Sequence, residues 1–168
     1  MSLERIREIT TEMLEQRGFE VSEVADELVG TSQTKPAIIV FFNQSPKINN
    51  DRVQEYILKM RNDNFTHAII VYNDAVTSTA QKVIDELKGM RIELFKKSTL
   101  RYNITKHRLV PAHSLLTKTE MKTFKDTYGT KIPIILYNDP VARFYDFQRG
   151  EIIKVERSNG FICYRIVK

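Results

Sequence analysis

The sequence predicts a mixed α/β protein in two parts. An α/β domain with a small, mainly parallel sheet and flanking helices is expected over residues 1–100, and a small α+β domain over residues 101–168. Before residue 100, buried-strand patterns alternate with helical ones, as in parallel sheets joined by crossovers. After it, a helical pattern precedes two strand patterns that a tight turn joins. The charge also changes, because residues 1–103 hold 14 Lys and Arg against 15 Asp and Glu, and residues 104–168 hold 12 against 6.

The chain begins with a predicted helix over about 3–17. Its apolar residues recur at the spacing of one helix face: Leu3, Ile6, Ile9, Met13 and Leu14. Ser2 can cap the start of this helix, and Gly18 can end it. Residues 22–29 could form a second short helix, and the composition of residues 30–36 predicts a loop.

Three buried strands and two helices are predicted next. The strands are short apolar runs: AIIVFF (37–42), HAIIVYN (67–73) and RIELF (91–95). Asp51 is expected to cap the first intervening helix. Ser78-Thr79 is expected to open the second, and Gly89 to end it. Strands joined through helices in this way predict parallel pairing with right-handed crossovers.

A capping box marks the helix of the C-terminal part. Thr117-Lys118-Thr119-Glu120 has the Ser/Thr-x-x-Glu pattern, in which the first and fourth side chains satisfy backbone N–H groups reciprocally. The predicted helix carries Met121, Phe124 and Tyr128 on one side, and Gly129 ends it.

The strands of the C-terminal part follow this helix. IPIILY (132–137) is predicted to form a short strand. EIIKVER (151–157) and FICYRIVK (161–168) are predicted as two strands joined by Ser158-Asn159-Gly160. In this turn, Asn-Gly is expected to supply the positive φ angles that a tight connection needs.

No catalytic or metal-binding motif is recognisable. Cys163 is the one cysteine and lies in an apolar alternating run, so it is interpreted as a small buried hydrophobic residue. His67, His107 and His113 have no third ligand at recognisable spacing and are interpreted as structural. Ser114 follows His113 without a G-x-S-x-G pattern. No glycine-rich phosphate loop occurs either, so no cofactor or metal is expected.

A metal-dependent nuclease is the alternative that a small α/β domain with a basic neighbour suggests. One large class needs an acid and then acid-x-Lys on adjacent strands. Glu86-Leu87-Lys88 matches the second element, but it lies on the predicted helix 78–88. Glu93 lies on the predicted strand 91–95, where Lys96 points to the opposite face. The nuclease pattern is therefore weak.

The basic C-terminal third favours contact with nucleic acid or an acidic protein surface, although a solvated basic face explains the charge equally well. Its densest segment is NDPVARFYDFQRG, residues 138–150. Arginines beside aromatic residues are typical of protein interfaces, of nucleic-acid stacking surfaces, or of a core flanked by solvated cations.

Within this segment, Asp139 is expected to cap the turn that Pro140 starts, and Val141 and Ala142 to pack under the sheet. Arg143 either pairs with Asp139 or another acid, or reaches a partner.

Three stretches of the chain carry a family resemblance: NITKHRLVPAHSLLTKTEM, KIPIILYNDPVAR and RGEIIKVERSNGFICYRIVK. In order and spacing, over about 65 residues, they resemble the C-terminal part of the fifth subunit shared by eukaryotic nuclear RNA polymerases. The module is also similar to the corresponding small subunit of archaeal RNA polymerase. Upstream, RIREITTEMLEQRGFEV, AIIVFF, HAIIVYN and TSTAQKVIDEL resemble the first helix and the jaw domain of the eukaryotic family.

The resemblance implies a non-catalytic structural subunit of a multisubunit DNA-dependent RNA polymerase, without an active site, cofactor or small-molecule substrate. The C-terminal module is expected to anchor on the largest subunit, and the jaw to lie near downstream DNA. The implied partners are the largest and neighbouring subunits and, through non-specific backbone contacts, DNA; no membrane is expected. The alternatives are a free-standing nucleic-acid-binding or nuclease-like protein, and an adaptor that carries the module.

The resemblance also assigns site residues. The implied subunit interface consists of His107, Pro111, His113, Thr117, Asp139, Pro140, Val141, Ala142, Arg143, Tyr145, Arg149, Gly150, Tyr164 and Arg165. Thr77-Ser78 stands where the family has a Thr-Pro pair near DNA.

The sequence departs from the family in three places. Ser78 replaces the proline, and Asp146 replaces a glycine, which suggests that this corner needs no positive φ. The loops at 30–36 and 158–160 are short. A chain trimmed in this way points to a large DNA virus or a divergent eukaryote. The expected location is the nucleus for a cellular protein, and a cytoplasmic viral factory or the virion for a viral one.

Overall fold

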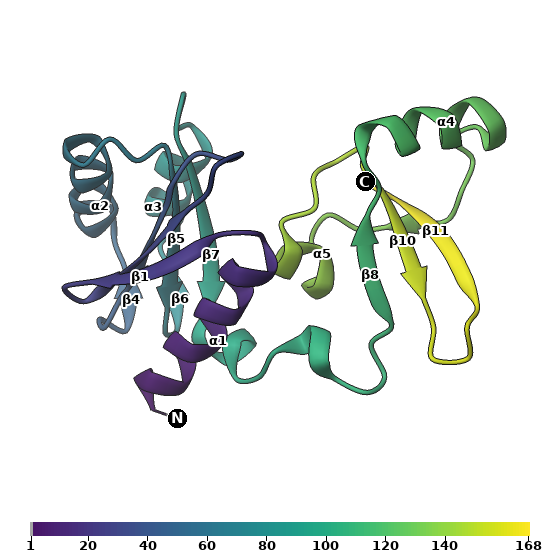
Figure 1. The fold of residues 1–168 in the computed structure, drawn as a ribbon. Helices are drawn as coiled ribbons and strands as arrows, with labels where there is room; N and C mark the ends of the chain where they lie inside the picture. Colours follow the sequence, from purple (N-terminus) through teal and green to yellow (C-terminus); the bar gives the residue numbers. More distant parts are fainter. Residues whose placement is uncertain (1) are drawn as a thin grey trace. The chain divides into compact units, whose positions relative to one another are not determined.

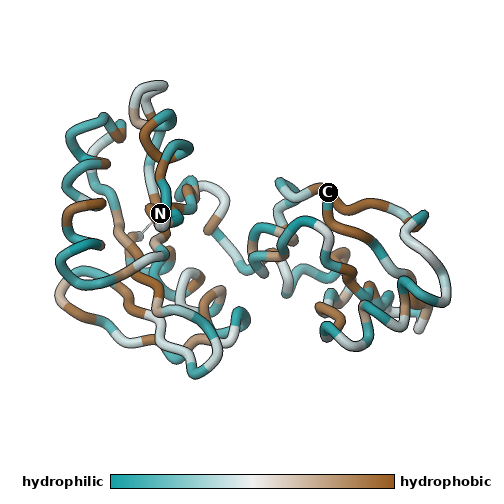
Figure 2. The backbone as a smooth tube through the Cα atoms, turned by 90° about the horizontal axis from the view of Figure 1, so that it is seen from above, coloured by the Kyte–Doolittle hydropathy of each residue, from teal (hydrophilic) through white to brown (hydrophobic). Residues whose placement is uncertain are grey.

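The computed structural model describes residues 2–168 and divides into two compact units, Met1–Tyr102 and Asn103–Lys168 (Figure 1). Each unit has its own sheet and its own cluster of buried apolar side chains. In Figure 2 the hydrophobic stretches concentrate in the inner strands of the units, and the outer helical turns alternate between hydrophobic and hydrophilic residues. Within the described residues, no helix combines the length and apolar character needed to cross a membrane.

A five-stranded mixed sheet forms the centre of the N-terminal unit, in the order β1-β2-β3-β5-β7. The strands are β1 (Glu20–Val24), β2 (Glu27–Thr31), β3 (Ile38–Phe42), β5 (His67–Tyr72) and β7 (Arg91–Lys96). The last three correspond to the predicted buried strands and pair in parallel. The hairpin β1–β2 joins the sheet through antiparallel pairing of β2 with β3. The mixed α/β class is therefore confirmed, with a sheet that is mixed rather than mainly parallel.

The helix considered at residues 22–29 is absent, because this segment forms the hairpin β1–β2. The chain reverses at Ala25, which has a φ of 53°. Gly30 on β2 is buried against its neighbours, since a Cβ atom at this position would lie 2.8 Å from Ile38 Cγ2 and 3.1 Å from Phe19 Cβ. This close approach requires glycine in the strand.

Three helices cover the sheet: α1 (Leu3–Gln16), α2 (Asn50–Asn62) and α3 (Ser78–Asp85). The predicted cap at Ser2 is confirmed, because its side chain accepts the Arg5 N–H. Asn49 caps α2 instead of Asp51, which lies in the first turn of the helix. The third helix ends at Asp85, well before the predicted stop at Gly89.

Alternate residues of the central strands point to opposite faces of the sheet. Ile39, Phe41 and Ile70 belong to one core cluster together with buried residues of α2 and α3. Helix α1 lies on the other face (Figure 1). There the Arg7 guanidinium stacks over the Phe42 ring, 4.6 Å from its centroid. Two short strands, β4 (Lys47–Ile48) and β6 (Ala75–Val76), pair in parallel just before α2 and α3, and the 3-10 helix η1 (Lys97–Leu100) follows β7.

The C-terminal unit contains a four-stranded sheet in the order β8-β10-β11-β9. Its elements are η2 (Ile104–Lys106), β8 (Ala112–Leu115), α4 (Lys118–Tyr128), β9 (Ile134–Ile135), α5 (Pro140–Tyr145), β10 (Ile152–Glu156) and β11 (Ile162–Val167). The predicted capping box, helix and final hairpin are confirmed. Strand β8 and helix α5 were not predicted, and β9 is much shorter than the expected 132–137. In the hairpin turn Gly160 has a φ of 79°, whereas Asn159 does not adopt a positive φ.

Candidate interaction surfaces

The period-two alternation of β10 and β11 divides the predicted interface residues between two faces of the C-terminal sheet. On one face, which we call the α5 face, Val155 and Cys163 pack in a core cluster with Ala142 of α5. On the opposite α4 face, the ring of Tyr164 lies 4.7 Å from that of Phe124 on α4. Tyr164 and Arg165 are adjacent in sequence and therefore point to opposite faces.

Asp139 positions the start of α5. Its Oδ1 accepts the Val141 N–H at 2.8 Å and the Ala142 N–H at 3.4 Å, and Pro140 occupies the first turn. The predicted cap is therefore confirmed, and it fixes Asp139 as part of the helix terminus. Val141 is 7% exposed and Ala142 0%. Both are buried as predicted and therefore offer little surface of their own to a partner.

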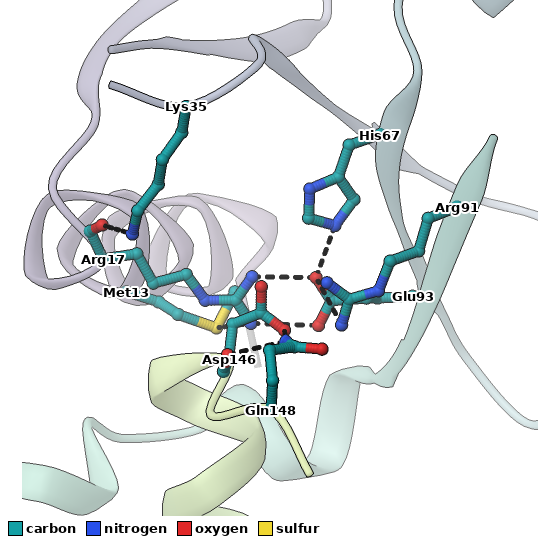
Figure 3. A network of polar contacts seen from close by, with 8 residues as sticks. All are labelled: Met13, Arg17, Lys35, His67, Arg91, Glu93, Asp146 and Gln148. Atoms are coloured by element: carbon teal, nitrogen blue, oxygen red, sulfur yellow. Dashed lines mark hydrogen bonds and ion pairs between the residues drawn. The ribbon is translucent and has the colours of Figure 1, made fainter. Parts of the chain in front are cut away.

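The end of α5 contradicts the expectation for Asp146. Its φ of 60° and ψ of 41° are left-handed, and the Phe147 N–H bonds to the Ala142 carbonyl to close the helix. This C-terminal geometry favours glycine, and aspartate is one of the few other residues that adopt it readily. The Asp146 carboxylate also accepts a hydrogen bond of 2.7 Å from the Gln148 amide (Figure 3). The corner does need a positive φ.

The aromatic residues around α5 are mainly structural. Phe144 and Phe147 are buried, and Tyr145 stacks on Phe147 with ring centroids 5.1 Å apart. Arg143 and Tyr145 are half-buried. Arg149 is exposed, and its guanidinium lies 4.9 Å from the Tyr137 ring centroid.

Three polar residues from separate elements gather on the α5 face: His113, Asp139 and Arg165. His113 on β8 donates from Nδ1 to the Pro111 carbonyl at 2.8 Å, and Arg165 on β11 donates to the Ile134 carbonyl at 3.1 Å. Burial lowers the pKa of His113. The Pro111 hydrogen bond and the Asp139 charge oppose this shift, and the Arg165 charge adds to it. The structure therefore brings His113, Asp139 and Arg165 within electrostatic reach of one another.

The remaining predicted interface residues are dispersed. The exposed His107 accepts the Leu109 N–H at Nδ1, and Gly150 donates to the Val167 carbonyl. Thr117 caps α4, and its backbone N–H and hydroxyl both donate to Glu120 at 2.8 Å. These hydrogen bonds lower the pKa of Glu120. The sequence signature is thus spread over both faces rather than gathered in one patch.

In the N-terminal unit, Thr77 and Ser78 form the start of α3. The Thr77 hydroxyl accepts the Ala80 N–H at 3.3 Å, and the Thr77 N–H donates to the Ile48 carbonyl at 3.0 Å. Ser78 is the first helical residue, the position at which proline is favoured. The turn therefore keeps a geometry that suits the Thr-Pro pair, although proline itself is missing.

A buried ion pair in the N-terminal unit escaped the sequence analysis. Arg17 Nη1 lies 2.9 Å from Glu93 Oε1, its Nη2 lies 3.1 Å from Oε2, and His67 Nε2 lies 2.7 Å from Oε1 (Figure 3). The Arg17 side chain is 1% exposed and that of Glu93 10%. Both carboxylate oxygens are thus engaged. Glu86-Leu87-Lys88 follows the end of α3, so it does not lie on the predicted helix, and it does not lie on a strand either.

The Arg17 guanidinium keeps Glu93 ionised. Burial by itself raises the pKa of Glu93, but the charge of Arg17 and the hydrogen bonds from His67 and Arg17 outweigh this effect. The pKa of Glu93 is therefore held well below its usual range. His67 contributes one of the hydrogen bonds to this carboxylate.

Comparisons with known proteins find relatives that match most of the chain. The family model described as the C-terminal domain of RNA polymerase Rpb5 matches residues 102–167. Subunit rpabc1 of DNA-directed RNA polymerases I, II and III from Dictyostelium discoideum is 36% identical over 140 residues, which cover 77% of this chain and 71% of the relative. The RPABC1 subunit of Caenorhabditis briggsae is 30% identical over 97% of this chain and 94% of its own length.

A viral relative is also similar over its full length. This protein of Invertebrate iridescent virus 6, described as a candidate DNA-directed RNA polymerase subunit, is 32% identical over 181 residues. The similarity covers 96% of this chain and 97% of the viral protein.

Proposed function

The chain belongs to the Rpb5 family of DNA-directed RNA polymerase subunits, and on this basis we propose that Asn103–Lys168 anchors it on the largest subunit of the polymerase. It is a structural subunit in transcription, with no active site of its own. The observation that carries the proposal is that the family match, residues 102–167, has nearly the same limits as the C-terminal unit. An element that anchors a subunit is expected to fold as one such unit.

The proposed contact residues are those of the sequence signature that retain some surface. They are His107, Pro111, His113, Thr117, Asp139, Pro140, Arg143, Tyr145, Arg149, Gly150, Tyr164 and Arg165. Val141 and Ala142 are buried beneath this surface, and Ala142 packs with residues of the sheet.

The N-terminal unit is proposed to form part of the lower jaw of the polymerase, near downstream DNA. Thr77 and Ser78 would lie closest to the DNA, and the exposed polar turn at the start of α3 supports this placement. Contacts of this kind reach phosphates rather than base edges, so no sequence preference is expected.

The proposed location depends on the polymerase that contains the chain. A cellular polymerase would place it in the nucleus, and a viral one in a cytoplasmic factory or the virion. Relatives of both kinds support these two possibilities.

Purification of the native complex through a tag on this chain tests the proposed function. We expect the largest polymerase subunit to be recovered in stoichiometric amount, as measured by quantitative mass spectrometry. Recovery of a lone chain would contradict the proposal. As a control for the nuclease alternative, the isolated protein should leave DNA intact with Mg²⁺ or Mn²⁺.

A further inference from the structure

A groove in the C-terminal unit shares Pro111 with the proposed anchoring contacts and is otherwise lined by residues outside them. It has a volume of about 650 Å³ and lies between the segment that leads into β8 and the turn that joins β10 to β11. One wall is formed by residues 108–112 and the other by residues 156–160. Its walls contain both cationic and apolar side chains, which together indicate what it can bind.

The cationic side chains are Arg108 and Arg157, one on each wall. Both are exposed, and no acidic group of residues 2–168 forms an ion pair with either. Glu156, the acid that lines the groove, pairs with Lys154 at 3.1 Å instead. The groove is therefore lined by two arginines without a neutralising partner, and their planar guanidinium donors match carboxylates in geometry.

The apolar side chains are unusually exposed. Leu109 lines the groove and is 75% exposed, and Phe161, which follows the lining residue Gly160, is 60% exposed. Val110 and Pro111 add further apolar surface to the same wall. Arginine combined with large apolar side chains is typical of surfaces that bind proteins. Phosphate binding depends on charge, and exposed aliphatic groups do not strengthen it.

An open sheet edge begins at the end of the groove. Ala112 is both a lining residue and the first residue of β8, which pairs with β10 on one side and ends the strand order on the other. The hydrogen bond between His113 Nδ1 and the Pro111 carbonyl fixes the entry into this strand. The groove lies on the β10 side of β8, whereas the unpaired edge of β8 lies on the side away from β10, so a segment in the groove does not pair with this edge.

We propose that this groove binds an extended segment of a neighbouring protein subunit, in which an aspartate or glutamate lies beside an apolar side chain. The carboxylate pairs with Arg108 and Arg157, and the apolar side chain packs on Leu109 and Phe161. The inference rests on the proposed function, since the neighbour is a subunit of the polymerase.

Site-specific cross-linking in the intact polymerase tests the identity of the occupant. A photoreactive phenylalanine analogue replaces Leu109, and a matched variant carries it at Tyr128, which is 70% exposed on α4. From position 109 we expect a cross-link to one segment of another protein subunit, with an acidic residue next to an apolar one. A cross-link to nucleic acid, or to a segment without an acid, would overturn the inference. So would the same product from both positions.

Charge reversal tests the role of the arginines. In the tagged full-length chain, Arg108→Glu with Arg157→Glu should lower recovery of the polymerase roughly tenfold, because two charge-assisted contacts become repulsive. Lys118→Glu with Lys122→Glu changes the charge equally on exposed α4 and should alter recovery less than about twofold. If the unmodified chain recovers no polymerase, the proposed function fails. If it does and both double variants recover the polymerase equally well, the inference about the groove fails alone.

Discussion

Glu93 carries the counter-charge of the buried Arg17 guanidinium in the N-terminal unit. Replacing it by glutamine leaves the Arg17 guanidinium buried without a counter-charge, and breaking a buried pair in this way typically costs about 3 kcal/mol. We therefore expect Glu93→Gln to lower the free energy of unfolding by roughly this amount, as measured by urea denaturation. Glu86→Gln, at an exposed position, is the matched control and should have little effect.

The same pair makes stability depend on pH. Because folding depresses the pKa of Glu93 below its ordinary value of 4.5, the stabilisation is fully present above that pH and declines as the pH falls further, toward the folded-state pKa. The difference in stability between the unmodified chain and Glu93→Gln should consequently shrink below pH 4.5. A difference that stays constant or grows on acidification would contradict this account.

Substitutions at Asp146 measure the cost of its left-handed backbone conformation and not that of losing a charge. Its left-handed φ of 60° costs an alanine more than a glycine, so Asp146→Gly should be more stable than Asp146→Ala by about 1 kcal/mol. Both variants lose the hydrogen bond from Gln148, and their comparison therefore isolates the effect of φ. Thermal unfolding of a unit as small as Asn103–Lys168 should separate their midpoints by roughly 4–8 °C, and equal midpoints would show that this corner is not strained.

At the scale of elements, α4 is a helix that the C-terminal unit leaves largely uncovered. None of its residues is buried, and the Phe124–Tyr164 ring contact ties it to the sheet. An isolated helix of 11 residues is marginal in water, so its terminal capping box should matter more than usual.

Thr117→Ala removes this cap and should cost α4 about 1 kcal/mol. The effect should be local, with backbone amides of α4 exchanging hydrogen roughly fivefold faster while global unfolding changes little. Hydrogen exchange followed by mass spectrometry measures both. Thr123→Ala, at an exposed position inside the helix, should not accelerate exchange, because alanine is the better helix former. Similar acceleration in both variants would exclude the cap as the cause.

Elements with strong local signals were predicted well from the sequence. The run Ile38–Phe42 is apolar because both faces of β3 are covered, and the capping box at Thr117 is a property of neighbouring residues. The hairpin β1–β2 was missed because β1 is largely exposed and the close packing at Gly30 has no hydrophobic signal. Its turn, moreover, uses Ala25, which is not a typical turn residue.

The residues of the candidate sites divide in the same way, into those with a local sequence signal and those without one. The cap at Asp139 followed from the adjacent proline, and the structure has it as predicted. The left-handed φ of Asp146 depends on how α5 closes, which composition does not reveal. Arg17 and Glu93 are 76 positions apart, so no local pattern connects them. A glutamate in the middle of a buried strand was the available signal, since such a charge requires a partner.

At the scale of the whole molecule, the described residues form two compact units, and each contains a buried apolar cluster of its own. Ile39, Phe41 and Ile70 belong to one, and Ala142 and Val155 to the other. Each core is made from residues of one unit, so cutting the chain between the units should leave both folded. The junction is suitable for such a cut, because Arg101 and Tyr102 are exposed, whereas Asn103 is buried and caps η2 through its bond to the Thr105 N–H.

This separation allows the anchoring role to be tested after assembly. A protease site inserted between Arg101 and Tyr102 leaves the Asn103 cap intact, and the full chain is first incorporated into the polymerase. After cleavage and washing, we expect the C-terminal fragment to stay bound and the N-terminal fragment to dissociate, as followed by immunoblots against tags at the two ends. The reason is that the proposed anchoring contacts lie in Asn103–Lys168, whereas the jaw is expected to make few contacts. Retention of the N-terminal fragment with loss of the C-terminal one would reverse the assignment of anchor and jaw.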